Sequence, residues 1–289
     1  MLEHTTMSGK TVLITGAGSG IGRETARGLA SAGARVVMTC TDREKTGPVC
    51  EALKRQTGNS AIELLQLDLA APASVREFAA EFSRRYHQLH VLINNAGVFS
   101  LKRQETPGGF EHTIAVNYLG PFLLTRLLLP VLRQTPGARI INVSSDAYSQ
   151  GRIDPSDFHL QRNYSGIKAY GASKFALMLF TLELADRLRD TGITVNVVHP
   201  GTVATGIWQL WPGTWYQGLM DRIMGLFAST PAQASRTSIY LATSAAVQGI
   251  TGAYFAKEKQ KDLAPKCRDK ALQQELWRLS EKLTGLEPA

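Results

Sequence analysis

The chain has 289 residues, is 44% hydrophobic, and carries 32 basic and 24 acidic side chains for a formal net charge of +8. This length and apolar content predict one large α/β domain with a substantial buried core. Cys40, Cys50 and Cys267 are too few and too scattered for a disulfide framework or a zinc site. The six histidines show no metal-ligand spacing, so we expect no metal and a reducing compartment.

The positive charge does not by itself indicate nucleic-acid binding. Basic and acidic residues alternate, as in residues 42–45, and no basic run is interleaved with aromatics. Residues 1–10 lack the apolar stretch of a signal peptide, and the richest apolar run, residues 122–130, is interrupted by Arg126. We therefore expect a cytoplasmic protein with a flexible N-terminus at residues 1–7, at most peripheral to a membrane.

Short β-branched runs alternate with helical patterns along the chain. The predicted strands are Thr11 to Thr15, Arg35 to Thr39, Ile62 to Leu67, Val91 to Asn94, Arg139 to Ser144, Thr194 to His199 and Gly252 to Phe255. The helices expected between them are Ile21 to Ala32, Arg43 to Gln56, Val75 to Tyr86, Phe110 to Leu132, Tyr170 to Arg189 and Ala232 to Ala242. Ser74 to Glu77 has the form of a capping box that would start the third helix.

Strands and helices in this order predict right-handed crossovers and a parallel sheet covered on both faces. The expected fold is α/β, a single-domain doubly wound Rossmann fold over residues 8–289 with a seven-stranded, mostly parallel sheet. A last helix at Asp269 to Leu283, within a helical extension at 266–286, is expected to pack on the domain edge. Its leucines on one face are Leu272, Leu276, Leu279 and Leu283.

The most informative local pattern is the run from Thr15 to Gly22, between the first strand and the first helix. A dinucleotide pyrophosphate needs this order: Gly16 permits a tight turn, Gly20 lets the backbone approach the phosphates, and Gly22 lets the helix pack closely. The helix N-terminus would face the negative charge. On its own, the run is also compatible with an ordinary glycine-rich turn.

In doubly wound folds, ligands bind beyond the carboxyl ends of the strands. We therefore expect the functional side chains among the residues that follow each strand. These are Gly16 onward, Cys40 to Arg43, Asp68 and Leu69, Asn95 to Gly97, Ser144 and Ser145, and Pro200 and Gly201.

Tyr170 and Lys174 stand four residues apart and share one face of a predicted helix. A phenol with its ordinary pKa near 10 is a poor acid–base catalyst at neutral pH. An adjacent ammonium and a positively charged nicotinamide favour the phenolate, which would make Tyr170 a usable general acid or base. The spacing alone arises often by chance.

Six motifs follow one another in a fixed order: the glycine run, Asn94-Asn95-Ala96-Gly97, Asn117, Ser144-Ser145, Tyr170-x-x-x-Lys174 and Pro200-Gly201. In this order, from about Lys10 to Leu286, the chain resembles the short-chain dehydrogenase/reductase family.

The resemblance implies a role for each catalytic residue. Tyr170 would donate a proton to the substrate oxygen, and Lys174 would lower the pKa of Tyr170 and hold the nicotinamide ribose. Ser145 would polarise the substrate carbonyl, with Ser144 as the alternative. Asn117 would support a water-linked proton relay, unless it is a helix-interior asparagine bonded to backbone.

The resemblance also implies a set of cofactor contacts. Asp68 would contact the adenine, residues 202–205 would meet the nicotinamide amide, and His199 is expected to be structural. The implied cofactor-binding residues are Gly16, Ser19, Gly20, Ile21, Gly22, Thr41, Arg43, Asp68, Leu69, Asn95, Ala96, Gly97, Tyr170, Lys174, Pro200, Gly201, Thr202, Val203 and Thr205.

The choice of cofactor depends on the end of the second strand. Cys40 falls where NAD-preferring relatives carry an acid, and Thr41 falls where many NADP-preferring relatives carry arginine. Thr41 and Arg43 could still bind a 2′-phosphate. The sequence therefore favours NADP and leaves NAD open.

The substrate side is similar to the retinol-dehydrogenase-like branch, through the segment from Asp154 to Leu160 and the late Leu276-Trp277. Members act on retinal, retinol or other apolar aldehydes, ketones and alcohols. Residues 206–231 are expected to form a substrate lid, with Trp208 and Trp211 facing the substrate. Core packing, a dimer contact and shallow membrane contact are alternative roles for this segment.

We therefore expect an oxidoreductase that acts on a lipophilic carbonyl or alcohol. The alternative is a cofactor-binding regulatory or scaffold protein without turnover. An extended-type nucleotide-sugar epimerase is disfavoured by the glycine spacing. Family resemblance implies a homodimer or homotetramer, although monomers occur in this branch, and no nucleic-acid partner is expected.

Overall fold

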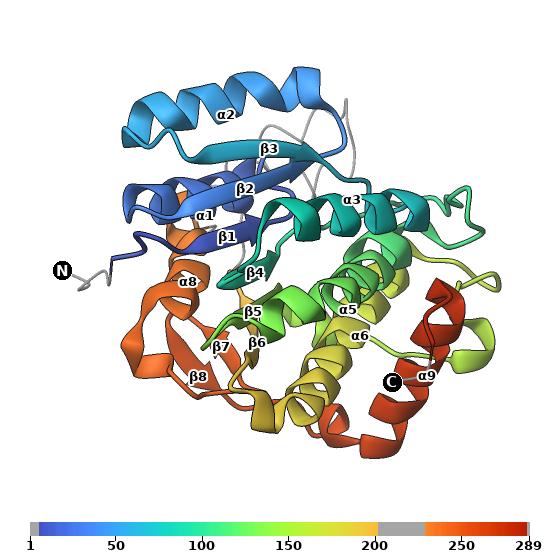
Figure 1. Ribbon diagram of the computed structural model, residues 1–289. Helices are drawn as coiled ribbons and strands as arrows, with labels where there is room; N and C mark the ends of the chain where they lie inside the picture. The colour runs from blue at the N-terminus through green and yellow to red at the C-terminus, as the bar shows by residue number, and fades with distance from the viewer. Residues whose placement is uncertain (1–5, 202–228, 288–289) are drawn as a thin grey trace.

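One eight-stranded sheet, in the order β3-β2-β1-β4-β5-β6-β7-β8, organises the computed structural model, which describes residues 6–201 and 229–287 (Figure 1). Neighbouring strands are parallel except for β7 and β8. The strand order reverses at β1, so the predicted doubly wound Rossmann fold is confirmed. The strands are β1 (Thr11–Ile14), β2 (Arg35–Cys40), β3 (Ile62–Gln66), β4 (Val91–Asn94), β5 (Arg139–Val143), β6 (Thr194–His199), β7 (Tyr254–Ala256) and β8 (Lys259–Lys261).

The longer helices are α1 (Gly20–Ser31), α2 (Arg43–Thr57), α3 (Pro72–Arg85), α5 (Gly120–Arg133), α6 (Gly166–Arg187), α8 (Pro231–Thr243) and α9 (Lys270–Thr284). They lie on both faces of the sheet (Figure 1). One core contains Phe78 and Phe122 from α3 and α5, together with apolar residues of α6 and α9. The other contains Leu29 and Leu53 from α1 and α2, together with apolar residues of α8. The central strands β1 and β4 are buried at every residue, as strands covered on both faces must be.

The eighth strand was not predicted. Residues 259–261 read Lys-Gln-Lys and are all exposed at the sheet edge, so they show no apolar alternation. The turn that leads into β8 places Lys257 and Glu258 at φ values of +52° and +60°. Asparagine or glycine usually marks such a hairpin turn, and neither residue stands here.

The third helix begins before the predicted capping box, which is therefore wrong. Pro72 is the first residue of α3, where its fixed φ suits a helix start, and Ala71 is the N-cap. The Ser74 hydroxyl accepts a hydrogen bond from the backbone N–H of Asp68 at 3.0 Å. Ser74 thus anchors the loop after β3.

The predicted single helix at residues 110–132 contains three segments: α4 (His112–Ile114), a π-helical turn η1 (Ala115–Leu119) and α5. By length and composition, the helix His112–Arg133 could cross a bilayer, and it is longer than the apolar run at residues 122–130. Of its most apolar window, 78% is buried inside the fold, as in a core helix.

Both ends of the described chain pack on the domain. Met7, expected within the flexible N-terminus, is 5% exposed and donates its backbone N–H to the Ala32 carbonyl. On α9, Leu276 and Trp277 are buried in the first core. The other three leucines of the predicted face, Leu272, Leu279 and Leu283, are only partly buried against that core.

Candidate active site

The turn between β1 and α1 is held against the loop that follows β4. The Asn95 amide donates to the carbonyl oxygens of Thr15 (2.8 Å) and Gly16 (3.2 Å). A Cβ on Gly22 would lie 2.3 Å from the Gly16 oxygen, and a Cβ on Gly16 would lie 2.8 Å from the Ala96 Cα. Gly16 also adopts a φ of +65°. Side chains are therefore excluded at both glycines.

This packing leaves the start of α1 facing the cleft. Ser19 is the N-cap residue, but its side chain makes no capping hydrogen bond. The first-turn N–H groups have no partner within the helix, and the helix dipole adds a partial positive charge. The residues present therefore fit the pyrophosphate of a dinucleotide.

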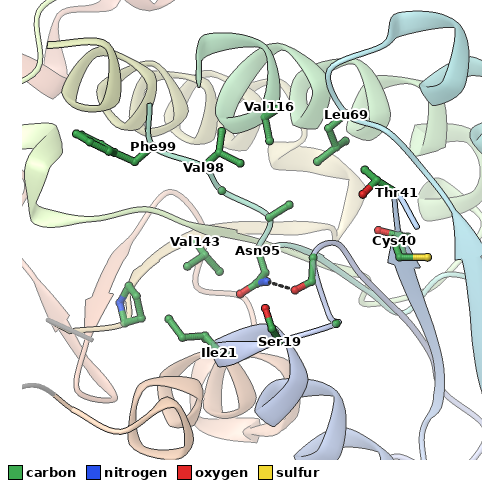
Figure 2. A pocket seen from close by; sticks show the side chains of 18 of the residues that line it. Ser19, Ile21, Cys40, Thr41, Leu69, Asn95, Val98, Phe99, Val116 and Val143 are labelled. Carbon is green, nitrogen blue, oxygen red and sulfur yellow. Dashed lines mark hydrogen bonds between the residues drawn. The ribbon is translucent and has the colours of Figure 1, made fainter. Parts of the chain in front are cut away.

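A cleft of about 890 Å³ runs along the carboxyl ends of β1 to β6. Cys40 and Thr41 lie at one end and Phe99 at the other, with Ser19 and Ile21 facing the loop after β4 across it (Figure 2). The predicted site residues that line it are Gly16, Ser19, Gly20, Ile21, Gly22, Thr41, Asp68, Leu69, Asn95, Ala96, Gly97, Ser145, Tyr170, Lys174, Pro200 and Gly201.

Two predicted site residues, Arg43 and Asn117, do not line this cleft. Five more, together with most of the expected lid at 206–231, lie outside the described residues. They are Thr202, Val203, Thr205, Trp208 and Trp211.

Arg43 is the first residue of α2 and does not line the cleft. Its guanidinium donates to the Leu64 carbonyl of β3 at 3.1 Å. Lys45 and Thr46, one turn into the helix, line the cleft instead. Asp42 caps this helix by accepting from the Lys45 N–H at 3.0 Å. Recognition of Asp42 as the N-cap could have indicated that Arg43 and Lys45 face different directions.

Tyr170 and Lys174 lie side by side in α6. The Lys174 Nζ is 5.6 Å from the centre of the Tyr170 ring and donates to the Val143 carbonyl at 3.0 Å. Burial lowers the pKa of Lys174 to about 8. Burial also raises the pKa of Tyr170, and a hydrogen bond from Ser145 partly offsets this rise. In the protein alone, burial therefore dominates, and the pKa of Tyr170 lies above its ordinary value.

The two serines after β5 have different surroundings. Ser144 is buried, and its hydroxyl donates to the Lys174 carbonyl at 3.3 Å. Ser145 lines the cleft together with Tyr170, and it lowers the pKa of the Tyr170 phenol against the effect of burial. It also accepts from the Ala147 N–H at 3.3 Å. This geometry supports Ser145 over Ser144 as the group that meets a substrate oxygen.

Asn117 sits in the π-helical turn, behind the cleft. Its Oδ1 accepts from the Val98 N–H at 2.7 Å, and its Nδ2 donates to the Val98 carbonyl at 2.9 Å and to the Ser173 hydroxyl at 3.0 Å. Asn117 thus ties the loop after β4 to the catalytic helix. Its part in a proton relay stays a prediction.

Several lining residues were not predicted as site residues. Asp146 follows Ser145 directly, and Phe99 packs edge-on against Tyr170 with ring centres 5.8 Å apart. Position just after a strand was the available signal for Asp146, and none marked Phe99. Four lining residues belong to the runs in which functional side chains were expected, among them the alternative serine: Gly18, Cys40, Asp42 and Ser144. The lining residues that the sequence did not indicate as site residues are Thr39, Lys45, Thr46, Val49, Leu67, Val98, His112, Val116, Val143 and His199.

Known proteins match this arrangement over most of the chain. Residues 10–213 match the sequence profile of the short chain dehydrogenase family. The chain belongs to this family. The short-chain dehydrogenase is 41% identical to human retinol dehydrogenase 14 over 97% of its length and 88% of the human protein. It is 40% identical to mouse retinol dehydrogenase 12 over 96% of its length and 87% of the mouse protein.

Solved structures share the fold of this short-chain dehydrogenase. A protein of uncharacterised function from Mycobacterium paratuberculosis is 32% identical, with a TM-score of 0.79 over 99% of this chain and 98% of its own. A short chain dehydrogenase from Escherichia coli CFT073, complexed with NADPH, is 25% identical, with a TM-score of 0.70 over 88% of this chain and 99% of its own. The protein is thus an NAD(P)-dependent oxidoreductase related to retinol dehydrogenases.

Proposed function

We propose that this short-chain dehydrogenase transfers a hydride between NADP and a lipophilic carbonyl or alcohol, such as retinal and retinol or another apolar aldehyde or ketone. One observation carries the proposal: the Tyr170 phenol lies beside the buried Lys174 ammonium in the same cleft as Ser145, and this cleft also takes in the glycine turn before α1. The names of the human and mouse relatives support the retinoid class of substrate.

The chain's own residues supply the proton chemistry. A bound nicotinamide supplies the hydride, or accepts it in the reverse direction. During reduction, Tyr170 gives its phenolic proton to the carbonyl oxygen while Ser145 donates a hydrogen bond to the same oxygen. The positive charge of Lys174 stabilises the phenolate that remains. During oxidation, the phenolate takes the proton of the alcohol.

The surroundings of Tyr170 support an apolar substrate. Phe99 covers its ring edge-on. Among the described residues, the large hydrophobic side chains that stand exposed are Leu101 (51%) and Ile167 (70%). Ile167 precedes Tyr170 by one helical turn, and a Cβ on its neighbour Gly166 would lie 3.1 Å from the Leu101 Cα. Two exposed apolar side chains thus lie at the start of α6, the helix that carries Tyr170.

The adenosine end supports NADP. Cys40 stands where an acid would repel a 2′-phosphate, and Thr41 and Lys45 offer a hydroxyl and an ammonium to bind it. Asp42 also lines the cleft, but its carboxylate is engaged in capping α2. We therefore assign to Lys45 the phosphate contact that the sequence analysis gave to Arg43.

A substrate panel tests the proposed function. NADPH and NADH consumption is measured with retinal and a series of apolar aldehydes and ketones, for the wild type, Tyr170→Phe and Tyr240→Phe. The control residue Tyr240 lies in α8 and does not line the cleft. We expect turnover with NADPH, a loss of at least about 100-fold in Tyr170→Phe, and near-wild-type rates in Tyr240→Phe. Equal turnover in all three proteins refutes the catalytic role, and cofactor binding without any turnover favours the scaffold alternative.

A further inference from the structure

The carboxylate of Asp146 joins the ends of three neighbouring strands. Its Oδ1 accepts a hydrogen bond from the Tyr254 hydroxyl of β7 at 2.7 Å. Its Oδ2 lies 3.0 Å from the Nε2 of His199, the last residue of β6. Asp146 itself follows β5, and the three strands are adjacent in the sheet (Figure 1).

His199 takes part in this cluster as a neutral donor. Burial lowers the pKa of its imidazole, more than the nearby Asp146 raises it, so the ring is uncharged at neutral pH. Because a carboxylate can only accept, the Nε2 carries the proton. Within the described part of the chain, the buried Nδ1 has no hydrogen-bond partner. The close contact with Asp146 is therefore the polar contact that orients the ring.

The cluster lies directly beside the catalytic serine. Asp146 begins the short helix η2 (Asp146–Ser149), and Ser145 is its N-cap. Tyr148 of the same helix packs edge-on against Tyr254, with ring centres 5.5 Å apart. Ser145, Asp146 and His199 all line the cleft. The backbone that carries the Ser145 hydroxyl is thus held from the sheet side through Asp146.

Because Asp146 is exposed, its contacts can orient the neighbouring backbone without adding much to the stability of the fold. Its side chain is 71% exposed, whereas that of His199 is 13% exposed. Hydrogen bonds and ion pairs to an exposed carboxylate contribute little to folding, because water competes for them. They still select one orientation of the residue that follows Ser145.

We propose that Asp146 is a positioning residue: by binding Tyr254 and His199 together, it holds the Ser145 hydroxyl against Tyr170 in the reactive geometry. The proposal rests on the proposed function, because it assigns Asp146 to the same site. It requires in addition that Asp146 affect catalysis only through the position of Ser145.

A double-mutant cycle tests that requirement. Asp146→Asn keeps the size of the side chain but leaves one acceptor oxygen for two donors. We expect it to lower kcat with NADPH and retinal about tenfold in the wild-type background and less than about twofold in a Ser145→Ala background. The Kd for NADPH should change less than about twofold. Asp154→Asn, at an exposed aspartate that caps another short helix, is the control and should leave kcat unchanged.

The size of the loss in two other variants and the thermal stability of Asp146→Asn give two further readouts. Tyr254→Phe removes one of the two donors and should cost less than Asp146→Ala, which removes the shared acceptor. The thermal midpoint of Asp146→Asn should stay within about 3 °C of the wild type, since the carboxylate is exposed.

The pH dependence of alcohol oxidation gives an independent test. The Ser145 hydrogen bond lowers the pKa of Tyr170, so displacement of Ser145 should move the acidic limb of the profile upward in Asp146→Asn but not in Asp154→Asn. The groups that face this phenol include Ser145 and Lys174, which remain in both variants.

Three results for Asp146→Asn each overturn the proposal: an acidic limb that does not shift, an unchanged kcat, or an equal loss of kcat in the wild-type and Ser145→Ala backgrounds. If Ser145→Ala has no measurable turnover, the position of the acidic limb in the pH profile of Asp146→Asn decides whether the proposal holds. Failure of the wild type to turn over any substrate refutes the proposed function itself, which is a distinct outcome.

Discussion

At the scale of single residues, opposing effects act on the Tyr170 phenol. Burial raises its pKa, and the hydrogen bond from Ser145 lowers it. Lys174 lies close by but is itself buried, which disfavours its charge. An oxidised nicotinamide, which is positively charged, would favour the phenolate further when bound. Catalytic competence is thus a joint property of the chain and its cofactor.

The buried Lys174 predicts a pH dependence of stability in the cofactor-free protein. Its pKa falls from 10.5 in the unfolded chain to about 8 in the folded one. Between these pH values the unfolded state binds more protons, so this group makes stability rise with pH and contributes no slope below about 8. In the wild type, the free energy of unfolding should rise by on the order of 3 kcal/mol over this pH range because of Lys174. Lys174→Met, measured by denaturant unfolding, should lack this rise.

Lys168→Met is the matched control for this experiment, because Lys168 is an exposed lysine in the same helix. It should keep the wild-type slope. Parallel slopes for the wild type and Lys174→Met would show that the folded protein holds Lys174 no differently from the unfolded chain.

Substitutions of Lys45 and Arg43 are expected to differ in their effect on the use of NADPH. Lys45→Ala should lower kcat/KM for NADPH about tenfold, by removal of one charge partner of the 2′-phosphate, and leave the value for NADH within about twofold. Arg43→Ala should change neither value, because its guanidinium is bonded to the Leu64 carbonyl. Steady-state kinetics with both cofactors decides between them, and the reverse pattern would restore Arg43 as the phosphate contact.

At the scale of elements, the cradle depends on how closely the β1–α1 turn approaches the loop after β4. A Cβ on Gly22 would meet the Gly16 carbonyl at 2.3 Å and the Asn95 amide at 2.5 Å. These groups belong to the backbone and to a hydrogen-bonded side chain, so neither can move aside without loss of the turn. The turn is therefore a rigid part of the site.

Gly22→Ala should consequently weaken NADPH binding at least about tenfold, because the first turn of α1 must shift away from the phosphates. Gly47→Ala, in α2, places its Cβ where no atom lies within 4 Å and should leave the affinity unchanged. Fluorescence titration with NADPH measures both. Equal affinities in the two variants would show that the cradle tolerates a side chain.

The sequence predicted the elements that show a continuous apolar run, such as β1 and β4, or a helical period, such as α1. It missed β8, whose three residues are all polar, and placed the start of α3 at Ser74 because a serine with a glutamate three residues later also occurs inside a helix. The π-helical turn at Ala115–Leu119 has no sequence signal of its own. Local patterns therefore identified the elements better than their boundaries.

At the scale of the whole molecule, the sheet brings residues from six strand ends to one cleft. Motif order was sufficient to predict Ser145, Tyr170 and Lys174 together. Side-chain direction was not predictable in the same way. Arg43 turns toward β3, and the contacts of Asp146 with His199 and Tyr254 depend on the adjacency of β5, β6 and β7.

Transfer of deuteride tests the central claim most directly. NADPH that carries deuterium at the reactive position of its nicotinamide is incubated with the enzyme and retinal, or with the best carbonyl of the panel, and the alcohol is examined by mass spectrometry. The proposed function predicts one deuterium on the carbinol carbon, with one alcohol formed for each NADPH consumed. An alcohol without deuterium, or NADPH binding without product from any carbonyl, would contradict it.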